Sequence, residues 1–241
     1  MMEAAFLGDL VKVKALVDSG SNIYQKNEFG WDALFFAIDG KHSEVALYLL
    51  RNGSNPDSRE PLRRSARWKR DKTWSTTLSG QTVLFGAVGA DLFNVAKELV
   101  KLGADVAVRD HYGSNALHFA RSPQVAQLLI DQGLDPNTTM KLPQGGDPLP
   151  IGSNSALILA AQDGRVGVMD VLLKAGANPS ARDVLGATAM HFAAQYNQVE
   201  AMKRLLETGK VDVNATDGSE TSLHWAVGYR RIDAVKFLLG A

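Results

Sequence analysis

A short segment built around a leucine or methionine recurs along the chain at a nearly fixed interval. We call the central residues of these segments anchors; they are Met1, Leu34, Leu84, Leu117, Leu157, Met190 and Leu223. Successive anchors lie 33 residues apart in four of the six intervals. Self-similarity at such a period is the mark of a repeat architecture, in which each unit buries its apolar face against its neighbours.

Each repeat has the sequence pattern of two short helices. The first contains the anchor followed by small residues such as Ala160 and Ala161, which allow a neighbouring helix to approach closely. The second carries valine and leucine at helical spacing, as at Val168, Val171 and Leu172. A glycine stands 19 residues after most anchors, where it suits a left-handed helix end. These glycines are Gly20, Gly53, Gly103, Gly176 and Gly209.

Three of the anchor segments carry a recognisable motif: Asn-Ala-Leu-His-Phe-Ala at 115–120, Thr-Ala-Met-His-Phe-Ala at 188–193 and Thr-Ser-Leu-His-Trp-Ala at 221–226. The motif resembles the ankyrin-repeat signature Thr-Pro-Leu-His-x-Ala, without its proline, and the resemblance covers nearly the whole chain. It implies an all-α fold, an ankyrin-repeat solenoid of helix-turn-helix units with β-hairpin-like loops and two long loop insertions.

We predict a single array over residues 1–241. The predicted units are approximately 1–27, 28–59, 79–109, 110–139, 152–182, 183–215 and 216–241. Two anchor intervals are longer than 33 residues, which predicts insertions at 60–78 and 140–151. The fourth unit is short around Pro123, which can begin its second helix but cannot lie inside one. The end units lack fully polar caps, so the sequence suits either a fragment or a short array.

The first insertion has an unusual charge. Residues 59–72 contain seven basic and two acidic side chains, although the whole chain has a formal net charge of zero. Trp68 and Trp74 lie in or beside this segment. Arginine and tryptophan are enriched at binding hot spots, so the segment is either a recognition finger or a solvated loop, and we favour the finger.

The sequence contains no pattern typical of catalysis or cofactor binding. It has no cysteine, no phosphate-binding loop, no nucleophile elbow and no zinc-protease helix. The resemblance implies that His118, His191 and His224, each directly after an anchor, are structural, as is His42. We therefore predict no enzymatic activity, no cofactor and no metal site.

Ankyrin repeats recognise partners through hairpin tips and the exposed side of the inner helices, and the candidate residues follow from those positions. At hairpin tips they are Phe29, Trp31, His111, Tyr112 and Leu185; on inner helices they are Tyr196 and Tyr229. The basic segment adds Arg63, Arg64, Arg67, Trp68, Arg70 and Trp74. Trp31 and Leu185 could instead pack on the neighbouring hairpin.

These features predict a protein-binding module that acts as an inhibitor, an adaptor or an immunity-type protein. The alternative is the recognition part of a larger enzyme or effector. We expect a protein partner with an acidic patch, because the finger is basic. Nucleic acid is a poor candidate, since the rest of the chain carries a net negative charge. No membrane span or signal peptide is visible, and we expect a monomeric, cytoplasmic protein.

Overall fold

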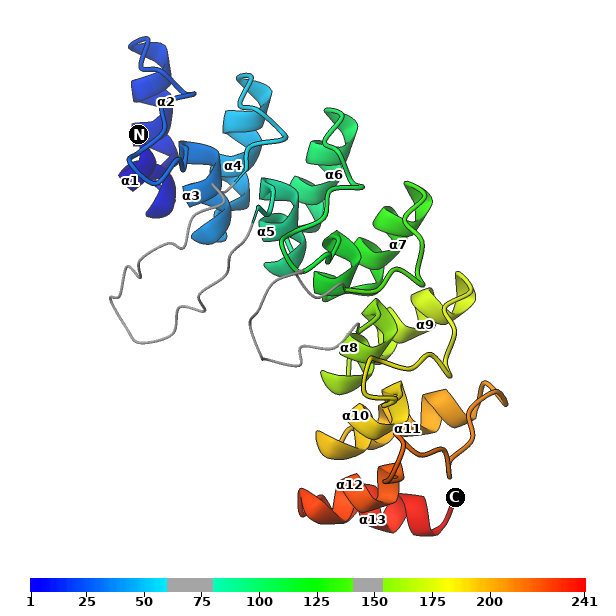
Figure 1. The fold of residues 1–241 in the computed structure, drawn as a ribbon. Helices are drawn as coiled ribbons and strands as arrows, with labels where there is room; N and C mark the ends of the chain where they lie inside the picture. The colour runs from blue at the N-terminus through cyan, green and yellow to red at the C-terminus, as the bar shows by residue number, and fades with distance from the viewer. Residues whose placement is uncertain (60–79, 141–153) are drawn as a thin grey trace. The chain divides into compact units, whose positions relative to one another are not determined.

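The computed structural model describes residues 1–59, 80–140 and 154–241. Regular structure in these ranges is helical, and it forms pairs of short helices that run along the chain (Figure 1). This confirms the predicted all-α fold. By their contacts the residues form two compact units, residues 1–111 and 112–241, which we call unit 1 and unit 2. The prediction of a single continuous array stays a prediction.

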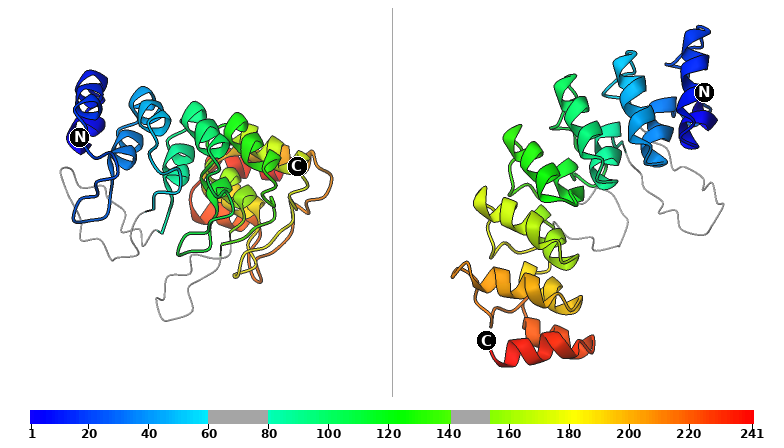
Figure 2. Two further views of the ribbon diagram at one scale, coloured as in Figure 1. Left: turned by 90° about the horizontal axis from the view of Figure 1, so that it is seen from above. Right: turned by 180° about the vertical axis from the view of Figure 1, so that it is seen from behind.

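Unit 1 contains three helix pairs, which lie side by side in both views of Figure 2. They are α1 (Met2–Phe6) with α2 (Leu10–Asp18), α3 (Ala33–Asp39) with α4 (Ser43–Arg51), and α5 (Val83–Gly89) with α6 (Phe93–Lys101). The first helix of each pair is the inner helix and the second is the outer helix. Contacts run from α1 to α3 to α5 and from α2 to α4 to α6, so each pair packs on the next one.

Unit 2 contains four helix pairs. They are η1 (Ala116–Phe119) with α7 (Pro123–Asp131), α8 (Ala156–Gln162) with α9 (Val166–Lys174), α10 (Ala189–Gln195) with α11 (Val199–Leu206), and α12 (Ser222–Gly228) with α13 (Ile232–Leu239). The inner helix of the first pair is a single four-residue 3₁₀ helix, whereas α8, α10 and α12 have seven residues each. Pro123 is the first residue of α7. The predicted shortening of the fourth repeat is therefore confirmed.

The anchors form the centre of the core. Leu34, Leu84, Leu117, Leu157 and Met190 are at most 1% exposed. Alanines that follow them, such as Ala161 and Ala194, are fully buried and let adjacent inner helices approach. Each buried leucine or methionine contributes about 1.5–3 kcal/mol. One repeat supplies few of them, so the helix pairs are stable only when stacked.

The glycines that follow the outer helices adopt the conformation that their spacing predicts. Gly53, Gly103 and Gly176 have φ angles of 94°, 86° and 92°. This left-handed region is unfavourable for residues with a Cβ atom, so glycine ends the helix there and the chain turns into the next loop.

In the described residues, the segments between helix pairs contain isolated β-bridges but no strands. Four isolated antiparallel bridges join Arg59 to Thr82, Thr139 to Ser155, Arg182 to Thr188, and Thr216 to Thr221. The first two bridges flank residues 60–79 and 141–153, so the described residues on either side of each of these ranges lie next to each other.

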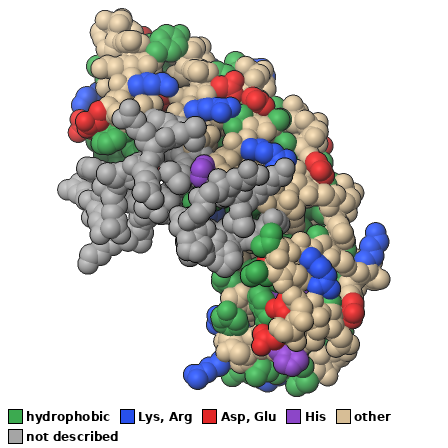
Figure 3. All heavy atoms as spheres, viewed as in Figure 1, with side chains coloured by type: hydrophobic (Ala, Val, Ile, Leu, Met, Phe, Trp, Pro, Cys, Tyr) green, Lys and Arg blue, Asp and Glu red, His purple; other side chains and the backbone are tan. Residues whose placement is uncertain are grey.

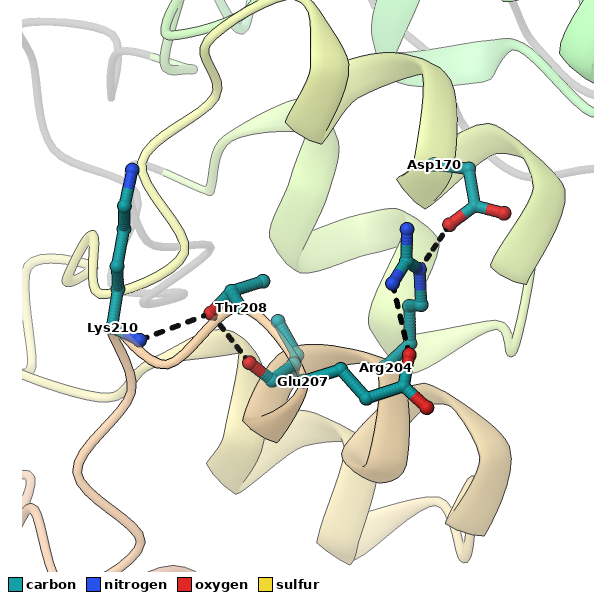
Figure 4. A network of polar contacts seen from close by, with 6 residues as sticks. Asp170, Arg204, Glu207, Thr208 and Lys210 are labelled. Carbon is teal, nitrogen blue, oxygen red and sulfur yellow. Dashed lines mark hydrogen bonds and ion pairs between the residues drawn. The ribbon is translucent and has the colours of Figure 1, made fainter.

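Outer helices of unit 2 are also joined by charged side chains (Figure 4). Arg204 of α11 donates from Nε to Asp170 of α9 and from Nη1, over 2.9 Å, to Glu207. The two carboxylates raise the pKa of the guanidinium. The side chains of Arg204, Asp170 and Glu207 are 33%, 37% and 61% exposed, so water screens the network, which orients α11 on α9 more than it stabilises the unit.

Candidate functional site

The hairpin tip that precedes α3 carries two of the predicted binding residues. Phe29 and Trp31 have ring centroids 5.7 Å apart, and the Trp31 ring stacks on Phe35 of α3 at 4.8 Å. Asn27 fixes the turn, because its Oδ1 accepts the backbone N–H groups of both Phe29 and Trp31. Phe29 is 39% exposed, whereas Trp31 is half-buried. The structure therefore makes Phe29 the accessible member and Trp31 its support.

This aromatic group continues onto α1 through residues that we did not predict. Phe36 meets Trp31 edge-on at 5.9 Å, and Phe6 meets Phe36 edge-on at 6.3 Å. Phe6 and the adjacent Leu7 are 43% and 66% exposed. A signal for them existed in the sequence. They stand five and six residues after the anchor Met1, as Tyr196 and Tyr229 stand six residues after their own anchors.

Unit 2 exposes aromatic residues at the C-terminal ends of its inner helices. Tyr196 and Tyr229, which directly follow α10 and α12, are 45% and 52% exposed. Trp225 lies between them in the chain, 5.5 Å from the ring of Phe192 and 6.5 Å from that of Tyr229. Hydrophobic side chains gather over this side of unit 2, with acidic groups among them (Figure 3). Both predicted tyrosines therefore lie where a partner can reach them.

The hairpin tip before α10 presents Leu185, which is 57% exposed. Asp183 holds this tip, since its Oδ1 accepts the N–H groups of Leu185 and Ala187 at 2.9 and 2.8 Å. Arg182 donates to the carbonyl oxygens of Gly186 and Thr216 and so ties the tip to the next loop. An apolar side chain on a braced turn loses little entropy when it binds.

The other predicted residues fall into two groups. His111, exposed, ends unit 1, and Tyr112, half-buried, begins unit 2. The six residues of the basic segment lie outside the described residues: Arg63, Arg64, Arg67, Trp68, Arg70 and Trp74.

The histidines after the anchors have the structural role that the resemblance implies. His191 accepts the Thr188 N–H at Nδ1 over 3.1 Å, so its Nε2–H donates to the carbonyl oxygen of Glu220 at 3.2 Å. Burial lowers its pKa, which favours this neutral form. His118 and His224 make the corresponding cap with Asn115 and Thr221. Each of these side chains fixes the start of an inner helix.

Within the described ranges, no three histidine or acidic side chains converge in a way that could hold a metal ion. In the same ranges, no helix is long and apolar enough to cross a membrane. What the described surface offers is exposed apolar and aromatic side chains on braced turns and helix ends.

Comparison with protein families identifies the origin of this arrangement. The family model "Ankyrin repeats (3 copies)" matches residues 1–76 and 157–241, about two thirds of the chain. The chain belongs to the ankyrin-repeat family. Ankyrin repeats generally mediate protein–protein interactions and are typically not catalytic. A solved structure supports the fold: the human ASB11 ankyrin repeat domain has a TM-score of 0.77 at 21% identity, over 99% of this chain and 95% of that one.

Curated relatives are similar over parts of the chain. The mitochondrial disaggregase of Bos taurus is 28% identical over 54% of this chain and 22% of its own length. A putative ankyrin repeat protein of Rickettsia felis is 25% identical over 71% of this chain and 48% of its length. Human protein phosphatase 1 regulatory subunit 27 is 38% identical over 23% of this chain and 36% of its length. The chain thus spans from about a fifth to a half of these relatives.

Proposed function

We propose that this ankyrin-repeat protein is a non-catalytic binding module that captures one protein partner and acts as an inhibitor, an adaptor or an immunity-type protein. One observation carries the proposal: large apolar side chains are exposed at the positions where repeats present their hairpin tips and inner-helix ends. Phe29, Leu185, Tyr196 and Tyr229 are 39–57% exposed. Rings and apolar side chains held on braced turns are the usual centres of binding energy.

The basic segment adds a prediction about the partner. Seven basic side chains in residues 59–72 would attract an acidic patch and speed its encounter with this protein. We propose a monomeric protein of the cytoplasm whose partner is a protein, not nucleic acid or a membrane. A related human protein is named a phosphatase regulatory subunit, which fits a regulatory role for a short array.

A second candidate function has its own support. The chain spans only 22% of the mitochondrial disaggregase it resembles. Repeats of this kind can therefore form the recognition part of a larger enzyme or effector. Both functions require binding by the described surfaces. They differ in what the binding serves: regulation of the partner in the first, and recognition for a larger enzyme or effector in the second.

Affinity purification of the tagged protein followed by mass spectrometry identifies the partner. Binding is then measured by surface plasmon resonance across salt concentrations. The variant Arg63→Ser, Arg64→Ser, Arg67→Ser and Arg70→Ser should slow association, most strongly at low salt, because exposed charges act over about 10 Å at 0.1 M salt. Trp68→Ala and Trp74→Ala should instead speed dissociation, by about 2 kcal/mol each if they are hot spots.

The matched control removes the same charge elsewhere: Lys97→Ser, Lys101→Ser, Lys174→Ser and Lys203→Ser, all exposed on outer helices. This control should bind normally. Tyr196→Ala and Tyr229→Ala should weaken binding without lowering the melting temperature, because both rings are about half exposed. Unchanged affinity in all of these variants would refute the proposed surfaces.

A further inference from the structure

The inner helices of unit 1 have an uneven distribution of charge. Glu3 of α1 is exposed, Asp39 of α3 reaches the surface although its neighbours partly desolvate its carboxyl, and α1, α3 and α5 contain no lysine, arginine or histidine. The basic residues of the outer helices of this unit are Lys12, Lys14, Arg51, Lys97 and Lys101. The basic side chains nearest to Asp39 in the chain are Lys41 and His42, in the turn after α3. The outer helices carry charges of both signs, including Asp18, Glu44 and Glu98, whereas the only charged side chains on the inner helices of unit 1 are acidic.

The acidic residues share their surface with exposed aromatic and apolar side chains. On α1, Glu3, Phe6 and Leu7 are separated by three and four residues, so they lie on one side of the helix. On α3, Phe36 and Asp39 are related in the same way. Phe6 contacts Phe36 edge-on at 6.3 Å, which brings the two helices together at this face.

The position of Asp39 in the repeat links it to this surface. It stands five residues after the anchor Leu34, as Phe6 stands five residues after Met1. The next residue, Gly40, is so close to α1 that a Cβ atom there would lie 2.6 Å from the Phe6 carbonyl oxygen. His42 adds a contact of 2.9 Å between its Nε2 and the same oxygen. Asp39 thus lies at the boundary between the first two repeats, beside the Phe6 backbone.

No hydrogen bond or ion pair to another described residue satisfies the Asp39 carboxylate, and it lies at the C-terminal end of α3, where the helix dipole disfavours negative charge. Partial burial also raises the pKa of the carboxyl. A carboxylate kept in such a place, next to exposed rings, is suited to a cation that arrives with a partner. Aromatic faces attract the same cation.

Building on the proposed function, we propose that Glu3, Phe6, Leu7, Phe36 and Asp39 form a docking surface for a segment of the protein partner that carries a lysine or arginine next to a large apolar residue. The cation pairs with Asp39 and Glu3, and the apolar residue packs on Phe6 and Leu7. This segment is distinct from the acidic patch expected to meet the basic insertion, so the partner presents both signs of charge. The arrangement would fix the direction in which the partner lies.

The test begins with a library of random twelve-residue peptides displayed on phage and selected on the purified full chain. Enriched peptides are synthesised, and their affinities are measured by fluorescence anisotropy. We expect peptides with lysine or arginine beside a leucine, phenylalanine or tryptophan. Their affinity should fall about tenfold or more in the variant Glu3→Gln with Asp39→Asn, and it should fall with added salt in the wild type only.

A matched variant controls for net charge. Asp18→Asn with Glu44→Gln changes the charge by the same amount on the outer helices α2 and α4 of the same unit, where both residues are exposed. This variant should bind the peptides as the wild type does. Because all four substitutions are at exposed positions, each protein should stay folded, and circular dichroism checks this directly.

Several results would overturn the proposal. Peptides that bind the Glu3→Gln, Asp39→Asn variant as well as the wild type would place their site elsewhere, although binding of protein segments would still stand. Selection of no peptide above a blank surface would contradict this docking surface and the proposed binding function together. Tighter peptide binding in the four-serine variant of the basic segment would mean that the chain's own arginines occupy the surface. Sedimentation could also show that the wild type forms dimers and that the Glu3→Gln, Asp39→Asn variant is monomeric. That result would mean that the surface binds a second copy of this chain and not a partner segment.

Discussion

The indole Nε1 of Trp225 donates a hydrogen bond of 2.9 Å to Oδ2 of Asp217, so the loop before α12 holds the largest ring of unit 2 in place. The other oxygen, Oδ1, accepts the backbone N–H groups of Ser219 and Glu220 at 3.0 and 2.9 Å. These bonds, led by those from Glu220 and Ser219, lower the pKa of Asp217 to about 2. A carboxylate that organises its own loop thereby also orients the aromatic surface around Tyr229.

The pH dependence of stability tests this arrangement. The folded-state pKa of Asp217 lies below its ordinary value of 3.8, so its carboxylate stabilises the fold above about pH 4 and stops doing so as the pH falls towards 2. Asp217→Asn should lose about 1–2 kcal/mol of stability near pH 7, because the amide nitrogen cannot accept a hydrogen bond. Urea unfolding followed by tryptophan fluorescence should show this loss shrinking in acid. Asp212→Asn, which affects one loop bond to Asn214, is the control; a loss for Asp217→Asn that is independent of pH would contradict the role of the charge.

Two glycines separate backbone strain from steric crowding. Gly176 has a φ of 92°, and a Cβ atom added there would meet nothing within 4 Å. Gly176→Val should therefore cost about 1–2 kcal/mol from the backbone conformation alone. Gly228 is equally open but has an ordinary helical backbone, so Gly228→Ala should be neutral or stabilise by up to about 1 kcal/mol. Thermal melts of both variants measure the two effects. Equal melting temperatures would show that Gly176 does not need a left-handed backbone at the helix end.

The shortened first pair of unit 2 should be its least stable part. Its inner helix η1 is a single 3₁₀ turn, with fewer backbone hydrogen bonds than the seven-residue helices α8 and α10. Hydrogen exchange followed by mass spectrometry should show opening of residues 118–140 before α8 to α11. Uniform protection along unit 2 would exclude a weak link at this position.

Arg165 supports this weak pair from the next repeat. Its side chain is 14% exposed, and its guanidinium donates to the carbonyl oxygens of His118 and Ala120 at the end of η1. Burial lowers the pKa of this arginine. Arg165→Met should cost about 1–3 kcal/mol, because two buried carbonyl groups lose their donor, and exchange in η1 should accelerate. Arg204→Met, which removes a solvent-screened ion-pair network, should destabilise the protein less than Arg165→Met does. A larger loss there than at Arg165 would reverse this ranking.

Periodicity predicted the helices and the helix ends because both depend on local chemistry. Leu157 and Met190 are buried where their spacing requires, and Gly53 and Gly103 have the left-handed φ that their positions require. The bond from Arg165 to Ala120 could not be predicted. It joins residues 45 positions apart, and arginine at the start of an outer helix is ordinary in sequence.

The candidate site was likewise predictable where it depends on the period of the repeat, and unpredictable where it depends on contacts between distant residues. Leu185, Tyr196 and Tyr229 follow from the register of the repeat and are exposed as expected. Phe6 and Leu7 follow from the same register, since they stand five and six residues after the anchor Met1. They were not predicted because the first repeat was not considered as a binding unit. The environment of Asp39 needed the structure, because neither its partial burial nor its place beside the Phe6 backbone is visible in the sequence.

Asp39 should reduce stability in the free protein. The C-terminal end of α3 repels its charge, which costs about 0.3–1 kcal/mol, and partial burial raises the pKa of the carboxyl above its ordinary value of 3.8. Because the folded protein then binds the proton more tightly than the unfolded chain, the charged group destabilises the fold at neutral pH, and this effect disappears as the pH falls below about 4. Asp39→Asn should therefore melt at a higher temperature than the wild type near pH 7 and at the same temperature near pH 3.

Asp18→Asn is the control. It shares the helix-end effect, since Asp18 ends α2, but Asp18 lies on the outer layer, so the gain in stability should be smaller. Lower stability in Asp39→Asn would reveal a favourable contact of the carboxylate within the chain itself. A gain in stability together with a loss of peptide affinity would show that the residue serves binding at the expense of the fold.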